Sequence, residues 1–308
     1  MKTWTSHQRN YRIEFVNRPG RKYSDARLAT LVAELRATAA TCFETLPDYQ
    51  VMKGTREELS DKILAMAWRR DGRMAGFCSC VVLPVPGVGK VLHLGLTCVR
   101  PEDRGAGLTH LLTRRAVSGH LLRHRPLGKV WVSNCAAVLS SLGSVALHFQ
   151  DVYPSPARNS SPSQTHRRIA AAINQHYRSK MFVPETATFD AESFIFRGSI
   201  KETVFAKEGD DSRFFHRQGS LNDYYRSLID FERGDEVLQI GCASTVGAVK
   251  HLYRKRFSRS DIPLVQPQST PEPLAVFLDE ETFAMQSDSF APPPVVAGSL
   301  PAYPYLGD

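Results

Sequence analysis

The sequence lacks the features that would place it in a membrane, among disulfide-bonded secreted proteins or around a metal ion. No apolar run reaches the roughly 18 residues that span a bilayer, and the first fifteen residues lack the apolar stretch of a secretory signal. The six cysteines are scattered, with no CxxC pair and no Cys/His cluster at zinc-ligand spacing. We therefore expect a soluble, reduced intracellular protein, cytoplasmic or nuclear, without a metal.

Basic residues are absent from the end of the chain. No Lys or Arg follows Arg259, whereas seven acidic residues do, so residues 1–260 carry +15 against +8 for the whole chain. Residues 261–308 also hold nine of the nineteen prolines, and this composition predicts a disordered tail. The basic surplus before the tail favours an anionic partner, such as a phosphorylated cofactor, an acidic protein or a nucleic acid.

Periodicity and turn signals predict an α/β arrangement over the first half of the chain. Asp71-Gly72 is typical of a tight hairpin, and Thr55 to Glu58 has the form of a capping box that would open a helix. The elements expected in chain order are a strand at 11–16, a helix at 24–41, a helix from 55, strands at 63–70, 73–82 and 91–99, a helix at 107–123, a strand at 129–134 and a short helix at 135–143. Beyond residue 153 we expect a helix at 166–182 and strands near 192–200 and 234–242.

The most informative stretch is the turn between the strand at 91–99 and the following helix. It contains Arg104, Gly105, Ala106, Gly107, Leu108 and Thr109. Glycines leave backbone N–H groups accessible, and the first N–H groups of a helix have no partner within the helix. The helix dipole adds partial positive charge, so the turn is suited to a pyrophosphate, and Arg104 can neutralise a further phosphate. A plain tight turn is the alternative interpretation.

With its preceding Val99-Arg100-Pro101-Glu102, this turn resembles the coenzyme-A-binding motif of the GNAT acyltransferases, [R/Q]-x-x-G-x-[G/A]. The sequence departs from the motif at Thr109, where Gly or Ala is usual. The resemblance covers residues 11–153 and implies a mixed twisted sheet flanked by helices. It implies that residues 104–109 hold the pyrophosphate. It also implies that the main chain of Cys98 and Val99 pairs with the pantetheine arm, and that Asn134 contacts the cofactor, with a helix N-cap as the alternative for Asn134.

Acyl transfer to an amine needs a base, because only the neutral amine attacks a thioester. His93 stands where several GNAT enzymes carry their Glu or His base, and a buried core histidine is the alternative. Many of these enzymes place a Tyr acid seven residues after the Asn, but this chain has Ser141 there. Tyr153 is the substitute that we consider for the acid, with packing as its alternative role.

Three regions are expected: a GNAT-like core at 1–153, a C-terminal extension at 154–260 that completes the sheet or the acceptor site, and the tail at 261–308. The resemblance implies an N-acyltransferase that uses acetyl-CoA or another acyl-CoA. A small-molecule amine is the favoured acceptor, and specialised metabolism the favoured setting. The alternatives are a protein or histone N-acetyltransferase, a non-catalytic acyl-CoA-binding regulatory module and, less favoured, a nucleic-acid-binding protein.

Overall fold

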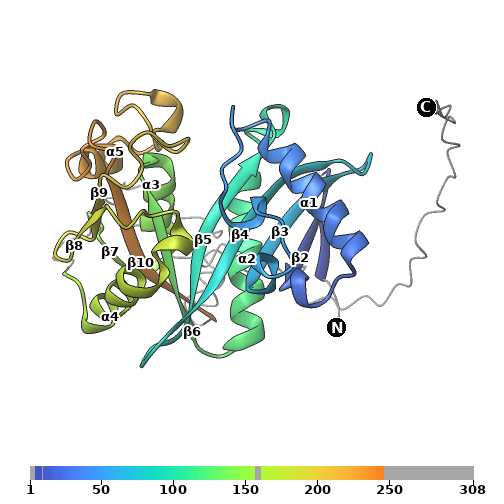
Figure 1. Cartoon of the computed structure of the whole chain (residues 1–308), viewed down its shortest axis with the longest axis horizontal. Coiled ribbons are helices and arrows are strands. Elements are labelled where there is room, and N and C mark those ends of the chain that lie inside the picture. Colours follow the sequence, from blue (N-terminus) through green and yellow to red (C-terminus); the bar gives the residue numbers. More distant parts are fainter. Residues whose placement is uncertain (1–3, 9, 157–160, 246–308) are drawn as a thin grey trace, which may run out of the picture. The chain divides into compact units, whose positions relative to one another are not determined.

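Ten strands and five α-helices are formed by residues 4–8, 10–156 and 161–245, which are the residues that the computed structural model describes (Figure 1). The strands are β1 Trp4–Gln8, β2 Tyr11–Asn17, β3 Lys62–Arg69, β4 Met74–Val85, β5 Gly89–Val99, β6 Lys129–Ala136, β7 Gln150–Tyr153, β8 Thr188–Asp190, β9 Ile195–Arg197 and β10 Glu236–Ser244. The helices are α1 Asp25–Ala39, α2 Leu108–His124, α3 Leu139–His148, α4 Gln164–Ala172 and α5 Gly219–Arg226. The tail expected at 261–308 lies outside the described residues.

All ten strands belong to one mixed sheet, in the order β1-β2-β3-β4-β5-β6-β10-β9-β8, and β7 pairs with β10 beside that path. Every pairing is antiparallel except that of β5 with β6. The parallel pair follows from the crossover through α2, since parallel neighbours need a long connection. The expected mixed sheet flanked by helices is confirmed.

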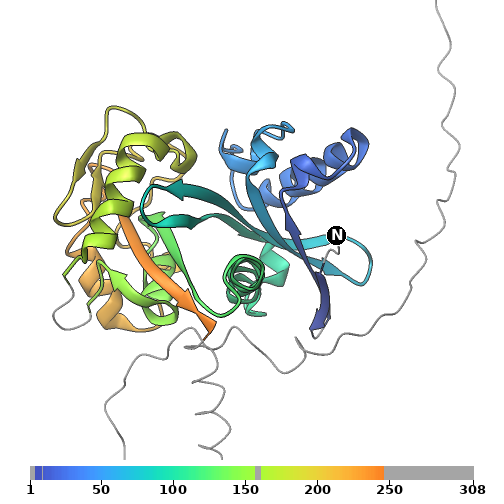
Figure 2. The same cartoon turned by 90° about the horizontal axis from the view of Figure 1, so that it is seen from below.

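Helices cover both faces of the sheet (Figure 2). On one face, α2 buries Leu108, Leu112 and Ala116 against apolar residues of β2 to β6. The opposite face carries α1 at one end and α4 at the other, each with its own apolar cluster. We call this second surface the α1–α4 face. None of the helices in the described ranges is both long and apolar enough to cross a bilayer.

Local signals predicted several elements correctly. The Asp71-Gly72 hairpin joins β3 to β4, and Gly72 has the positive φ of 85° that such a turn requires. Helix α1 begins after Ser24, whose side chain accepts a hydrogen bond from the Arg27 N–H.

Other expectations were wrong. The capping box at Thr55 opens no α-helix but only a short 3-10 turn at Glu58–Ser60. The strand β6 extends to Ala136, so the next helix spans Leu139–His148 rather than 135–143. The single helix expected at 166–182 is divided into α4, a π-helical turn at Ile173–Tyr177 and a 3-10 turn at Arg178–Met181. Pairing with β10, which runs as far as Val237 opposite Ala136, accounts for the longer β6.

The segment 154–235 lies between two strands of the same sheet. It contributes β8 and β9 to the edge of the sheet. The chain then continues as β10, which inserts between β6 and β9 and also pairs with β7. We call the segment 154–235 the insertion. Its helix α4 covers part of the α1–α4 face, whereas its helix α5 packs with α3 and Val237. The segment expected as an extension therefore contributes strands and helices to the same folded unit.

Candidate functional site

The turn after β5 has the backbone geometry of an anion site. Gly105 and Gly107 have φ values of 82° and 76°, and no heavy atom of the described residues would lie within 4 Å of a Cβ at either position. Gly107 is the N-cap of α2; within the described residues no side chain caps this end and no acid stands in the first turn. The N–H groups of Leu108, Thr109 and His110, the first of the helix, therefore have no intrahelical acceptor, and the helix dipole makes this end electropositive. Such a site suits a pyrophosphate.

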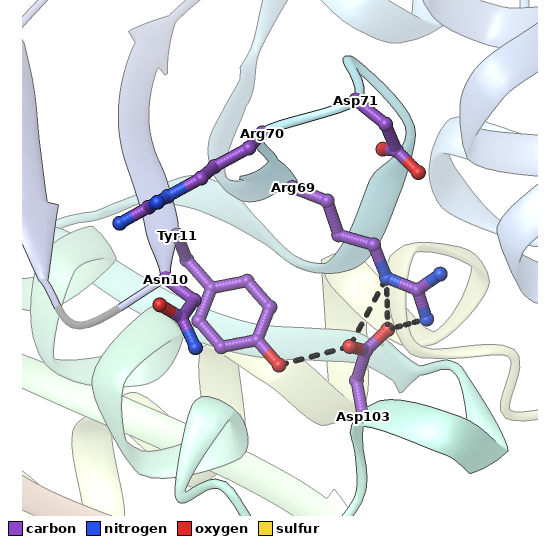
Figure 3. Close-up of a pocket in the computed structure, with 6 residues that line it drawn as sticks. All are labelled: Asn10, Tyr11, Arg69, Arg70, Asp71 and Asp103. Atoms are coloured by element: carbon purple, nitrogen blue, oxygen red, sulfur yellow. Dashed lines mark hydrogen bonds and ion pairs between the residues drawn. The ribbon is translucent and has the colours of Figure 1, made fainter.

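An ion pair between the half-buried Arg69 and the buried Asp103 holds the approach to this turn (Figure 3). The Arg69 guanidinium donates to both Asp103 oxygens, with Nε at 3.1 and 3.0 Å and Nη2 at 2.5 Å. The Tyr11 hydroxyl donates to the same carboxylate at 2.9 Å. These bonds tie the residue just before Arg104 to strands β2 and β3. We call Arg69, Asp103 and Tyr11 the turn clamp.

The clamp borders an open pocket of about 320 Å³ at the start of β2 and the end of β3. Asn10, Arg70 and Asp71 complete its lining, and Figure 3 shows their side chains around the clamp. The bonds to Asp103 raise the pKa of Arg69, so this guanidinium stays charged. All three residues of the clamp belong to the lining of this pocket.

Strands β5 and β6 separate on their way to the turn. Their parallel pairing runs only from Val91 opposite Trp131 to Leu94 opposite Asn134. On its other side β5 stays paired with β4 as far as Val99. Between Gly95 and Val99, one edge of β5 therefore offers backbone groups to which no strand of the described ranges pairs. We call this gap the β5–β6 splay. It ends at the glycine turn that precedes α2.

Two cysteines meet beside the splay. Cys98 is buried in β5, and Cys42, at the end of α1, donates from its thiol to the Val99 carbonyl at 3.4 Å. The pKa of Cys42 is lowered to about 6, first because the Cys98 thiol donates to its sulfur and further because of Thr41 and the Arg104 guanidinium. The predicted contacts of Cys98 and Val99 with pantetheine stay predictions, with Cys42 now placed next to them.

His93 lies on the α1–α4 face of β5 and is only 1% exposed. Its Nδ1 is 3.1 Å from the Ser133 hydroxyl of β6, and burial lowers its pKa to about 3. An imidazole with so low a pKa binds a proton weakly at neutral pH. Burial and partner favour the alternative interpretation of a core histidine, while its role as a base stays a prediction.

Asn134 is buried in β6 and does not cap a helix, because the strand continues past it and the N-cap of α3 is Val138. Its Nδ2 donates to Gln239 of β10 at 3.3 Å and to Ser141 of α3 at 3.5 Å. Gln239 in turn donates to the Tyr225 hydroxyl of the insertion at 2.7 Å. The N-cap interpretation was wrong, and Asn134 instead joins β6, β10 and α3 at the start of the splay.

Tyr153 ends β7 and packs edge-on against Phe194, with ring centroids 4.9 Å apart. Its hydroxyl donates to the Glu192 carbonyl, and burial raises its pKa. These are the contacts of a packing residue, the alternative considered above, and its role as an acid stays a prediction. Within the described ranges, no group of three His, Cys, Asp or Glu side chains is arranged to hold a metal.

Glu236 was not among the site residues predicted from the sequence. It begins β10, is 7% exposed, and accepts a hydrogen bond of 2.6 Å from the Ser199 hydroxyl. Burial raises its pKa to about 7, although bonds from Ser199 and Cys135 oppose this. In sequence, Glu236 follows Gly234-Asp235 at the start of an apolar strand, a pattern typical of a solvated strand end. Only the pairing of β10 with β6 and β9 explains why it is buried.

No protein-family model matches this sequence, and no curated protein does. Solved structures with a similar arrangement include YhbS, a GNAT-family N-acetyltransferase from Escherichia coli in complex with CoA. It is 17% identical at a TM-score of 0.33, over 46% of this chain and 69% of that chain. Escherichia coli ElaA is 17% identical at a TM-score of 0.33, and the match covers 48% of this chain and 94% of ElaA. A putative GNAT acetyltransferase from Desulfovibrio desulfuricans is 14% identical at a TM-score of 0.29, and the match covers 40% of this chain and 74% of that chain. Each likeness is one of fold and covers less than half of this chain.

Proposed function

We propose that this chain, whose fold is GNAT-like, transfers an acyl group from a coenzyme A thioester to a small amine. The observation that carries the proposal is the β5–β6 splay, which ends at a glycine turn with the uncapped N-terminus of α2 behind it. The pantetheine arm of the thioester would pair with the free edge of β5. Its pyrophosphate would accept hydrogen bonds from the N–H groups of Gly107 to Thr109, beside Arg104.

The insertion supports a compact acceptor rather than a protein. Its Phe182 and Phe205 form edge-to-face contacts with Tyr49, with ring centroids 5.8 Å apart in each pair, and Phe205 also meets Phe43. The insertion is thus packed onto the loop after α1, on the α1–α4 face that His93 also occupies. A surface covered in this way leaves little room for a folded protein partner. Acetyl is the acyl group that we favour, on the family resemblance alone.

Calorimetric titration with acetyl-CoA tests the binding half of the proposal. Arg104→Ala removes a charge-assisted contact, so the affinity should fall by about ten- to a hundredfold. Arg73→Ala, in the exposed hairpin, is its control and should bind like the parent protein. If both arginine variants bind alike, the assignment of the turn is wrong.

A matched pair of glycines separates backbone strain from ligand contact. Gly107 and Gly72 both have positive φ, at 76° and 85°, and at neither would a Cβ meet a neighbour within 4 Å. Valine should therefore strain both turns similarly, whereas only Gly107→Val fills the space of a pyrophosphate. We expect similar losses in melting temperature but loss of acetyl-CoA binding in Gly107→Val alone.

A non-catalytic acyl-CoA-binding module is the second candidate. It is favoured by the burial of His93, with its pKa of about 3, and by Ser141 at the expected acid position, where it accepts a bond from Asn134. Binding of acetyl-CoA without acylation of any amine and without thioester hydrolysis would favour this candidate over the enzyme.

A further inference from the structure

Glu236 is a buried carboxyl that neither the turn nor its clamp uses. Burying a carboxylate is costly unless it is paired with a cation, yet the bonds described for this one come from neutral groups, Ser199 and Cys135. A charge-bearing residue in such surroundings, at the start of an otherwise apolar strand, is a candidate for chemistry rather than for stability.

The strand register places this carboxyl on the α1–α4 face. Leu238 of β10 stands opposite Cys135 of β6, and both belong to the apolar cluster under α4. Because side chains two residues apart share a face, Glu236 lies on the same side as Leu238. Ser133 and Cys135 of β6 share that face as well, and His93 of β5 stands opposite Ser133.

The register also places Glu236 across β6 from the splay. Pairing of β5 with β6 ends at Asn134, so Cys135 is the first residue of β6 on this face to border the gap. Cys135 is partly exposed, and its thiol donates to the Glu236 carboxylate. The carboxyl is therefore one side chain away from the gap in which a thioester carbonyl would lie.

The groups that face Glu236 leave it as the proton acceptor. The titratable ones are the Cys135 thiol and the Tyr49 phenol, which interacts electrostatically with both Cys135 and Glu236. Burial raises the pKa of both, so they stay neutral around pH 7. Ser199 donates a hydroxyl proton and does not titrate. His93, on the same face, has a pKa of about 3, far below the operating pH of a base.

We propose that Glu236 is the general base of the acyl transfer, a role that rests on the proposed function. The Glu236 carboxylate takes one proton from the acceptor's ammonium group, directly or through a water. The neutral nitrogen attacks the thioester carbonyl, the N–C bond forms and the C–S bond breaks. The thiolate of coenzyme A leaves and takes up the second nitrogen proton, and Glu236 returns its proton to solvent. The products are the amide, coenzyme A with a free thiol and one proton.

Glu236→Gln tests the proposal, since glutamine keeps the shape and the bond from Ser199 but takes up no proton. The matched control is Glu232→Gln, an exposed glutamate four residues earlier. The probes are acetyl-CoA with butylamine, phenethylamine and spermidine, and acetyl-CoA with water alone, because hydrolysis also needs a base. We expect Glu236→Gln to lower kcat by about 10²–10⁴ and to remove the acid limb of the pH profile. Its acetyl-CoA affinity should stay within threefold of the parent's, because Glu236 lies away from the phosphate turn.

The outcomes separate this inference from the function on which it rests. Loss of turnover in His93→Gln together with full turnover in Glu236→Gln would overturn the inference and return the role to His93. A parent protein that binds acetyl-CoA but neither acylates nor hydrolyses it would also overturn it, while the binding assignment would stand. A parent protein that does not bind acetyl-CoA would refute the proposed function itself. An unchanged pH profile in Glu236→Gln, even with reduced kcat, would mean that the residue is structural.

Discussion

The turn clamp offers a direct test of how burial sets the strength of an ion pair. Two of the chain's Arg–Asp pairs, which are similar in length, differ in exposure. Arg69 and Asp103 are 2.5 Å apart with side chains 19% and 5% exposed, whereas Arg73 and Asp71 are 2.8 Å apart with side chains 68% and 46% exposed. Solvent screens the second pair and hardly reaches the carboxylate of the first.

The expected magnitudes follow from this difference. Removing one partner of a buried pair costs about 3–5 kcal/mol, because the remaining charge is left without compensation. Arg69 is partly exposed, and Tyr11 still donates to Asp103, so we expect about 2–4 kcal/mol for Arg69→Ala. An exposed pair contributes about 0–1 kcal/mol, and this is the loss expected for Arg73→Ala. At about 2–4 °C per kcal/mol for a large domain, Arg69→Ala should melt about 4–16 °C lower.

The assay is denaturant unfolding of both variants, followed by calorimetric titration with acetyl-CoA. Arg69→Lys keeps the charge but loses the bidentate hydrogen bonding to Asp103, so the stability of this variant should lie between those of the parent and Arg69→Ala. Because Asp103 precedes Arg104, Arg69→Ala should also weaken acetyl-CoA binding, and Arg73→Ala should not. Equal stability losses in Arg69→Ala and Arg73→Ala would refute the argument from burial. An intact affinity in a destabilised Arg69→Ala would show that the turn keeps its shape without the clamp.

Three further predictions concern the α1–α4 face. His93→Ala should destabilise the protein by about 2–4 kcal/mol through a cavity, while His93→Gln should be milder and should keep its turnover per folded molecule; melting curves and kcat on the same preparations check this. The folded-state pKa of Glu236, about 7, lies above its ordinary value of 4.5, so the stability that protonation gives is complete below pH 4.5 and is lost as the pH rises through 7. Glu236→Gln should therefore unfold with a flatter pH dependence across that window, and a dependence like that of the parent would place the carboxyl in solvent. A Cβ at Gly95 would lie 2.1 Å from Nε2 of Gln50, whose Oε1 accepts a hydrogen bond from the Ser79 hydroxyl, so Gly95→Ala should lower the melting temperature and Gln50→Ala should restore part of the loss. No recovery in the double variant would point to the backbone instead.

The sequence alone determined the elements whose signals are local. The Asp71-Gly72 hairpin, the start of α1 after Ser24 and the strand–turn–helix around Gly105 and Gly107 depend on backbone conformation and on periodicity within a few residues. These features could be predicted because a glycine with positive φ and an N-cap serine determine the conformation of their own and the adjacent residues. The family resemblance rests on the same local motif, and the sheet bears out the fold that it implies.

The tertiary structure decided what depends on distant pairing. Nothing near residue 236 indicates burial, and Glu236 is enclosed only because β10 enters between β6 and β9 after an insertion of about eighty residues. The same pairing extends β6 past Asn134, which removes its capping role, and packing encloses His93, which lowers its pKa to about 3. Burial is a property of the assembled sheet, so the residues best suited to act as a base could be distinguished only after the strands were in place.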